Sequence, residues 1–157
     1  MFTLSIDPGL RGCGVSLFNK KQLIKAVYVK STEQVKRGPE AWLAMAQAIL
    51  DSLPGVKVTH LVVEVPQVYN QAYWKGDPAD LIELAGVDGA ITVAVGATNN
   101  YGFLPREWKG QVPKDIHNKR VEAKLSVEEL ATIESTATVR HNVVDAVGLG
   151  LWFLGRR

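Results

Sequence analysis

The sequence predicts an α/β protein with a five-stranded mixed sheet and helices on both faces. The first 30 residues hold three strand-like segments separated by turn signals, which favours an antiparallel meander. Helical and strand-like patterns then alternate, which is typical of parallel strands joined by crossover helices. The length of 157 residues suits one hydrophobic core, so we take residues 1–157 as a single domain.

The meander is predicted over residues 2–7, 12–18 and 22–30, and the third segment is rich in Val, Ile and Tyr. Pro8–Gly9 and Asn19–Lys20 supply the turns. A right-handed crossover would then place the fourth strand beside the first and parallel to it.

Residues 39–53 carry one apolar stripe at helical spacing, with Pro39 in the first turn. Residues 58–65 are apolar almost throughout, which predicts a central strand buried on both faces. Asp77 before Pro78 is a typical helix start, and Ser126 with Glu129 forms a capping box. The later elements are predicted as a helix over 78–95, a strand over 100–105, a helix over 114–125, a short helix after 126 and a buried helix over 140–154.

Composition and charge exclude several classes of protein. Lys and Arg number 18 against 16 Asp and Glu, so any site for a polyanion must be a local patch. No apolar run approaches a membrane span, and the first residues lack the pattern of a secretory signal. Cys13 is the single cysteine, so an intrachain disulfide and a Cys-based zinc site are excluded. We therefore expect a cytoplasmic protein without a membrane partner.

Three acids lie in segments that are otherwise apolar. Asp7 ends the first strand, Glu64 ends the central strand and Asp145 lies within the last helix. No Lys or Arg is near Glu64 in the sequence or follows Asp145 closely, so converging carboxylates would repel each other. A divalent cation resolves that repulsion, and oxygen ligands favour Mg²⁺ or Mn²⁺.

Each acid also has a structural alternative. Asp7 could be a turn residue before Pro-Gly, Glu64 could close an ion pair, and Asp145 could pair with Arg140. His141 and Asn142 precede Asp145 by four and three residues, which places both on its helix face. Either side chain could complete a second metal position, although a lone histidine is more often structural. Two ions would suit phosphodiester hydrolysis.

Three motifs resemble those of RuvC-like Holliday junction resolvases, a branch of the ribonuclease H-like superfamily. They are SIDPGLRGCGVSLF, LVVEVPQVY and HNVVDAVGLGLW, and together they span nearly the whole chain. The likeness is strongest to short phage-encoded members. It implies a ribonuclease H-like fold and a Mg²⁺-dependent endonuclease that acts as a homodimer in DNA recombination and repair. Such an enzyme places paired symmetric nicks in four-way junctions and leaves 5′-phosphates.

The resemblance makes Asp7, Glu64 and Asp145 catalytic metal ligands for two Mg²⁺ ions, with Mn²⁺ as a substitute. Many family members carry an Asp or His three residues before the last acid, where this chain has Asn142. Asn is a weaker ligand, so we favour His141 as the fourth ligand and keep Asn142 open.

A local basic patch is predicted between residues 106 and 124, where six basic residues meet three acids. Lys109 and Lys114 flank turns near the predicted site and are expected to stabilise charge at the scissile phosphate. Any single lysine there could equally belong to a solvated helix face. The expected DNA contacts are Arg106, Lys109, Lys114 and Lys119, with Lys75 and Tyr69 from the loop after Glu64. Tyr69 would stack on an unpaired base, as the resemblance also implies.

Glycines suggest two further features. Gly9, Gly12 and Gly14 could let backbone approach a phosphate beside Asp7 or could need positive φ in a tight hairpin. Gly86 and Gly89, with their alanine neighbours, could permit helix approach across a dimer or packing within the chain.

Other functions remain open at this point. DxGxxxxG also resembles the phosphate loop of actin-like ATPases, although no adenosine loop is evident and we expect no nucleotide cofactor. A ribonuclease H-like enzyme acting on RNA or RNA–DNA hybrid is a second alternative. A non-catalytic junction-binding protein is a third, because Asn142 replaces an acid.

Overall fold

The computed structural model describes residues 1–31, 37–68 and 77–156. One sheet runs through the molecule in the order β5-β4-β1-β2-β3-β6. The strands are β1 (Phe2–Asp7), β2 (Cys13–Asn19), β3 (Gln22–Val29), β4 (Val58–Glu64), β5 (Asn99–Phe103) and β6 (Ile133–Glu134). The helices are α1 (Pro39–Ser52), α2 (Pro78–Val95), α3 (Pro105–Trp108), α4 (Lys114–Glu122), α5 (Val127–Leu130) and α6 (Arg140–Phe153).

The sheet is mixed, as the sequence predicts. β2 is antiparallel to β1 and to β3, whereas β4 is parallel to β1 and β5 is parallel to β4. The expected position of the fourth strand beside the first is confirmed. The prediction of five strands is one short, because β6 pairs with β3 through Ala26 and Val27. A strand of two residues is too short to show an alternating apolar pattern. The sequence therefore could not predict β6, which is defined by its pairing with β3.

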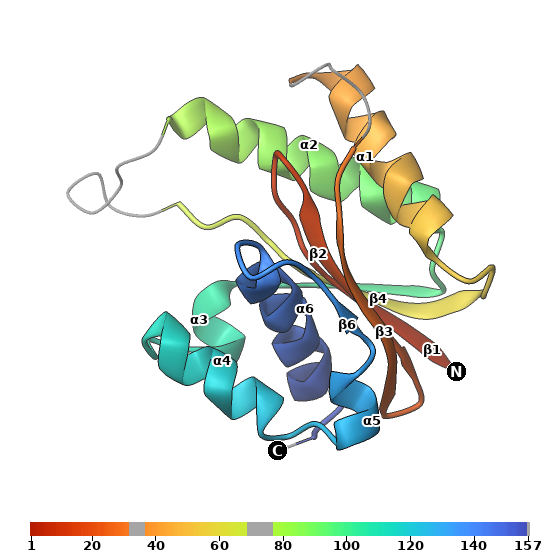
Figure 1. The fold of residues 1–157 in the computed structure, drawn as a ribbon. Coiled ribbons are helices and arrows are strands. Elements are labelled where there is room, and N and C mark those ends of the chain that lie inside the picture. The colour runs from red at the N-terminus through yellow and green to blue at the C-terminus, as the bar shows by residue number, and fades with distance from the viewer. Residues whose placement is uncertain (32–36, 69–76, 157) are drawn as a thin grey trace.

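Helices cover both faces of the sheet (Figure 1). α1 and α2 pack on each other over one face, and α6 packs on the other with α3, α4 and α5 around it (Figure 1). Two buried apolar clusters match these layers, one beneath α1 and α2 and the other beneath α6. None of the helices in the described residues is long and apolar enough to cross a membrane.

The predicted caps of two helices are confirmed. The Asp77 side chain accepts a hydrogen bond from the Ala79 amide at 2.9 Å, which caps α2. At α5, the Ser126 hydroxyl accepts from the Glu129 amide and Glu129 Oε2 accepts from the Ser126 amide. The strand predicted over 100–105 ends at Phe103, and Pro105–Trp108 forms the short helix α3, which the sequence does not predict.

Candidate metal and nucleic-acid site

The sheet places the first two acids side by side. β1 and β4 are parallel, and their register pairs Ile6 with Val63. The next residues are Asp7 and Glu64, which end their strands at the same edge of the sheet. Neighbouring strands lie about 4.8 Å apart, so two carboxyl groups leave the sheet close together.

Serine hydroxyls fix the last helix over this edge. Ser5 Oγ lies 2.8 Å and Ser16 Oγ 3.1 Å from the carbonyl oxygen of Ala146, and the two hydroxyls lie 2.7 Å apart. All of these atoms are buried, where a hydrogen bond to the helix backbone is costly to lose. These hydrogen bonds fix α6 to the sheet at Ala146, the residue after Asp145. They therefore position Asp145 near Asp7 and Glu64.

The helix can approach the sheet because glycines lie at the contact, Gly14 on β2 and Gly150 on α6 itself. A Cβ on Gly14 would lie 1.9 Å from the carbonyl oxygen of Asn142, and a Cβ on Gly150 would lie 2.3 Å from the Phe18 ring. None of Gly9, Gly12 and Gly14 has positive φ, so the hairpin interpretation of these glycines is wrong. Close packing is the reason for glycine at these positions.

The three acids share one electrostatic environment. Burial raises the pKa of Asp7 well above its ordinary value, and the charges of Glu64 and Asp145 raise it further. Burial also raises the pKa of Glu64, although Lys109 opposes that effect. At Asp145 burial acts in the same direction, but His117 and Lys109 outweigh it and the pKa is lowered. Glu64 and Asp145 both act on Asp7, and Asp145 acts on Glu64, so the three carboxyl groups lie within electrostatic range of one another.

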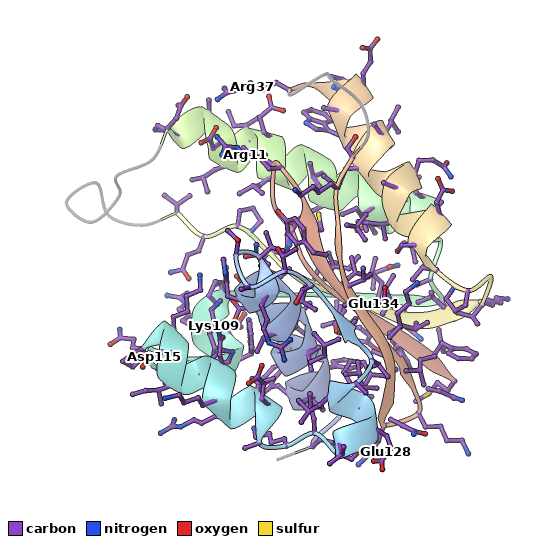
Figure 2. All side chains as sticks on the ribbon, viewed as in Figure 1. Arg11, Arg37, Lys109, Asp115, Glu128 and Glu134 are labelled. Atoms are coloured by element: carbon purple, nitrogen blue, oxygen red, sulfur yellow. The ribbon has the colours of Figure 1, made fainter. Side chains whose placement is uncertain are left out.

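A lysine lies among these acids. Lys109 is expected from the sequence near the site as a contact of the scissile phosphate, and the structure pairs it directly with the acids. Lys109 Nζ is 3.2 Å from Glu64 Oε2 and 3.4 Å from Asp145 Oδ2. Lys109 follows α3 directly, and Figure 2 shows it beside that helix. Burial lowers its pKa, but the three acids outweigh burial and the pKa is raised. Lys109 therefore stays protonated and neutralises part of the acidic charge.

The neighbouring tryptophan was not anticipated as a site residue. Trp108 Nε1 donates a hydrogen bond of 2.8 Å to Glu64 Oε2, the same oxygen that faces Lys109. The Lys109 ammonium also lies 5.0 Å from the centre of the Trp108 ring. The indole therefore holds both Glu64 and Lys109 in place. The sequence offers only the Trp-Lys-Gly turn as a signal for it.

His117 on α4 is a second residue that the sequence reasoning missed. Its Nε2 lies 3.3 Å from Asp145 Oδ1, and its ring packs edge-on against Trp108. Gly148 on α6 makes room for it, because a Cβ there would lie 3.3 Å from His117 Nε2 and 3.0 Å from the Trp108 ring. His117 is embedded in the basic helix, where its sequence neighbours suggest only a solvated face.

The residues expected as the fourth ligand lie at the start of α6. Burial lowers the pKa of His141, Lys114 lowers it further and Asp145 opposes them. His141 is thus within electrostatic range of both groups. The backbone carbonyl of Asn142 packs against Gly14, at the start of the helix.

The structural alternative for Asp145 is wrong. Arg140 pairs instead with Glu122 on α4, with Arg140 Nε 2.9 Å from Glu122 Oε1. Asp145 faces Lys109 and His117. The structural alternative for Glu64, an ion pair, is correct, because Glu64 pairs with Lys109.

The carboxylates of this site have the chemistry to bind a divalent ion, but their present arrangement does not surround one. Across residues 1–31, 37–68 and 77–156, no group of three or more His, Cys, Asp or Glu side chains is arranged around a common metal position. Carboxylate oxygens are the ligands that Mg²⁺ prefers, and their mutual repulsion favours a cation. Lys109 supplies that cation here, so an ion joining Glu64 and Asp145 requires the ammonium to withdraw from at least one of them.

Four of the six residues predicted to contact DNA lie in the described part of the chain. Arg106 lies on α3, and Lys114 and Lys119 lie on α4, with both lysines exposed. Lys114 lowers the pKa of Asp7 and is therefore near the acids. Tyr69 and Lys75 lie outside the described residues.

No family model and no curated protein sequence matches this chain. Solved structures do match it in fold. RuvC of Thermus thermophilus is 20% identical with a TM-score of 0.68, covering 96% of this chain and 92% of that one. The same protein in complex with a Holliday junction substrate has a TM-score of 0.69 at 20% identity, covering 96% and 90%.

The yeast mitochondrial Holliday junction resolvase Ydc2 is 10% identical with a TM-score of 0.61, covering 98% of this chain and 78% of that one. These similarities show that the chain has the ribonuclease H-like fold of RuvC, as its motifs led us to expect.

Proposed function

We propose that this protein is a divalent-metal-dependent endonuclease that resolves four-way DNA junctions by paired symmetric nicks. The observation that carries the proposal is the convergence of Asp7, Glu64 and Asp145 from β1, β4 and α6 beside a protonated lysine. Acids grouped with cations at one sheet edge suit hydrolysis of a phosphodiester. The likeness in fold to RuvC bound to a Holliday junction substrate supports junction DNA as the substrate.

Asp7, Glu64 and Asp145 would hold the metal, with Mg²⁺ or Mn²⁺ as the ions their oxygens suit. His141 remains the proposed fourth ligand, and Asn142 its alternative. The metal would supply an activated water and stabilise charge on the scissile phosphate. Lys109 and Lys114 would bind the phosphate oxygens and offset their negative charge. Burial of the acids keeps these interactions strong because little solvent screens them.

Binding of the DNA backbone is proposed for the basic residues around the acids. Arg106, Lys114 and Lys119 extend from the site along α3 and α4. Lys75 and Tyr69 follow Glu64 in the chain and would also contact the junction. Such contacts make binding strongly dependent on salt.

A homodimer would present two sites to the two-fold symmetric junction. An apolar groove between α1 and α2, with a volume of about 610 Å³, supports it. Leu43 is 63% exposed and Val93 is 84% exposed along this groove, and Gly89 lies open beside them. Gly86 serves a different purpose, because the Trp42 ring of α1 lies 2.3 Å from where its Cβ would be. A second copy of the chain is the proposed occupant of this groove, because a two-fold dimer would match the symmetry of the proposed substrate.

Nicking of a synthetic four-way junction with and without Mg²⁺ tests the proposal. We expect metal-dependent nicks at symmetric positions, and Asp7→Asn should still bind the junction in Ca²⁺ while nicking at least about 100-fold more slowly. Asp51→Asn, on α1 and away from the acids, is the matched control and should nick normally.

Nicking by Asp7→Asn at the unmodified rate would show that the metal assignment is wrong. Parallel reactions on RNA and RNA–DNA hybrid distinguish a junction enzyme from an RNA nuclease. Tight junction binding without nicking under any metal would identify a non-catalytic binder.

A further inference from the structure

A small cavity lies directly beside Glu64, between the ends of β1 and β4 and the helix α2. Its volume is about 170 Å³, and Glu64 is part of its lining. A cavity of about 150 Å³ with apolar walls accommodates one benzene ring. The space beside the proposed catalytic centre therefore suits one flat ring.

The walls of this cavity are apolar and come from separate elements. The chain leaving β1 and β4 contributes prolines, and α2 contributes two leucines one turn apart. The apolar residues that line it are Pro8, Val65, Pro66, Leu81, Leu84 and Pro105. Rigid proline rings and leucine side chains offer flat contact area at little cost in conformational entropy.

One polar side chain in the lining lacks a partner. Gln67 lines the cavity, and its side-chain oxygen is shielded from solvent without a hydrogen bond to any of the described residues. A buried acceptor left unpaired destabilises the protein, so a ligand that donates a hydrogen bond to this oxygen would recover the lost free energy. A carboxamide offers one acceptor and two donors in one plane, the pattern that pairs with the edge of a nucleobase.

We propose that this cavity is a nucleobase subsite, in which a base next to the scissile phosphate inserts and the Gln67 amide contacts its edge. The inference rests on the proposed function, because the base belongs to the DNA strand cut at Glu64. Apolar walls provide stacking and shape, while the amide provides discrimination among bases. The preference of the enzyme for particular nick positions would then originate here.

Fluorescence of 2-aminopurine tests the subsite without requiring cleavage. Junctions carrying this base on either side of the nick position are bound by Asp7→Asn protein in Ca²⁺. We expect fluorescence to rise on binding at one position, because the base leaves its stack. Gln67→Ala should reduce the rise, and Leu84→Phe, which fills the cavity, should abolish it. Val127→Phe, at a side chain that is 78% exposed on α5 and outside both the cavity and the α1–α2 groove, is the matched control for added volume and should leave the rise intact.

Nicking of a junction with an abasic nucleotide at that position provides the second measurement. Unmodified protein should nick it at least about fivefold more slowly than the junction with a base, in line with about 1–3 kcal/mol for a stacked base. Leu84→Phe should nick both junctions equally.

Fluorescence that rises equally in Leu84→Phe, or equal nicking of both junctions by unmodified protein, would overturn the subsite while leaving the nuclease intact. Failure to bind junctions at all would instead overturn the proposed function. Thermal unfolding of each variant confirms that it is folded.

Discussion

The ammonium of Lys109 lies 3.2 Å from Oε2 of Glu64. The same ammonium is 3.4 Å from Asp145 Oδ2, so it spans the two acids. Both carboxylates are largely buried, with 14% and 11% of their side chains exposed, and Lys109 is 25% exposed. A cation fixed by two buried charges competes directly with a divalent ion.

Removal of Lys109 should strengthen metal binding. Lys109→Met keeps the length of the side chain and deletes its charge, which leaves the repulsion between Glu64 and Asp145 for the metal to relieve. We expect the Kd for Mn²⁺ to fall by about tenfold, or ~1.4 kcal/mol, by isothermal titration calorimetry without DNA. Lys119→Met removes the same charge on the exposed part of α4 and should change the Kd little. An unaltered Kd in Lys109→Met would mean that the ammonium does not compete.

Asp88 should make stability depend on pH. Burial, reinforced by the charge of Glu64, raises its pKa from 3.8 to about 7, and both carboxylate oxygens lack partners among the described residues. The folded protein therefore holds this proton more tightly than the unfolded chain. The free energy of unfolding consequently falls as the pH rises from about 4 to about 7 and then stays level.

Replacement of Asp88 by asparagine, which is neutral and similar in shape, should remove the fall in the free energy of unfolding with pH. We expect Asp88→Asn to raise the free energy of unfolding by about 2–4 kcal/mol at pH 8 and to change it little at pH 3.5. Denaturant unfolding at both pH values measures the effect. An equal change at the two pH values would assign it to packing rather than to the proton.

Gly14 should not tolerate a methyl group. In Gly14→Ala the new carbon would lie 1.9 Å from the backbone oxygen of Asn142, and neither main chain can yield without moving α6 off β2. We expect a loss of about 3 kcal/mol or more in the free energy of unfolding, measured with denaturant. Gly89→Ala is the control, because a Cβ there meets nothing within 4 Å and helix propensity favours alanine. Normal stability of Gly14→Ala would mean that the helix does not rest on this strand.

The proposed dimer can be tested through Gly89. A lysine at this position fits the isolated chain but places a charge in the apolar α1–α2 groove. We expect the unmodified protein to sediment as a dimer and Gly89→Lys as a monomer that makes single nicks. Val127→Lys adds the same charge at an exposed site on α5 and should remain dimeric. A monomeric unmodified protein at all concentrations would exclude the groove as a dimer interface.

Much of the fold could be predicted because its strands and helix starts are determined by residues close together in the sequence. The apolar run of β4 ends at Glu64 and the meander begins with β1, so both strands were placed with their terminal acids. Asp77 and Ser126 identified helix starts because capping is a contact within one turn. β6 escaped prediction because two residues show no period and its pairing with β3 bridges about a hundred residues of chain.

The sequence by itself determined that three acids interrupt apolar segments, because burial of an uncompensated carboxylate is too costly to be incidental. Only the tertiary structure decided which cations face them. Lys109 and His117 reach the acids because Gly148 and the serine contacts at Ala146 let α3, α4 and α6 close over the sheet edge. Such contacts join residues far apart in the chain, and no local pattern records them.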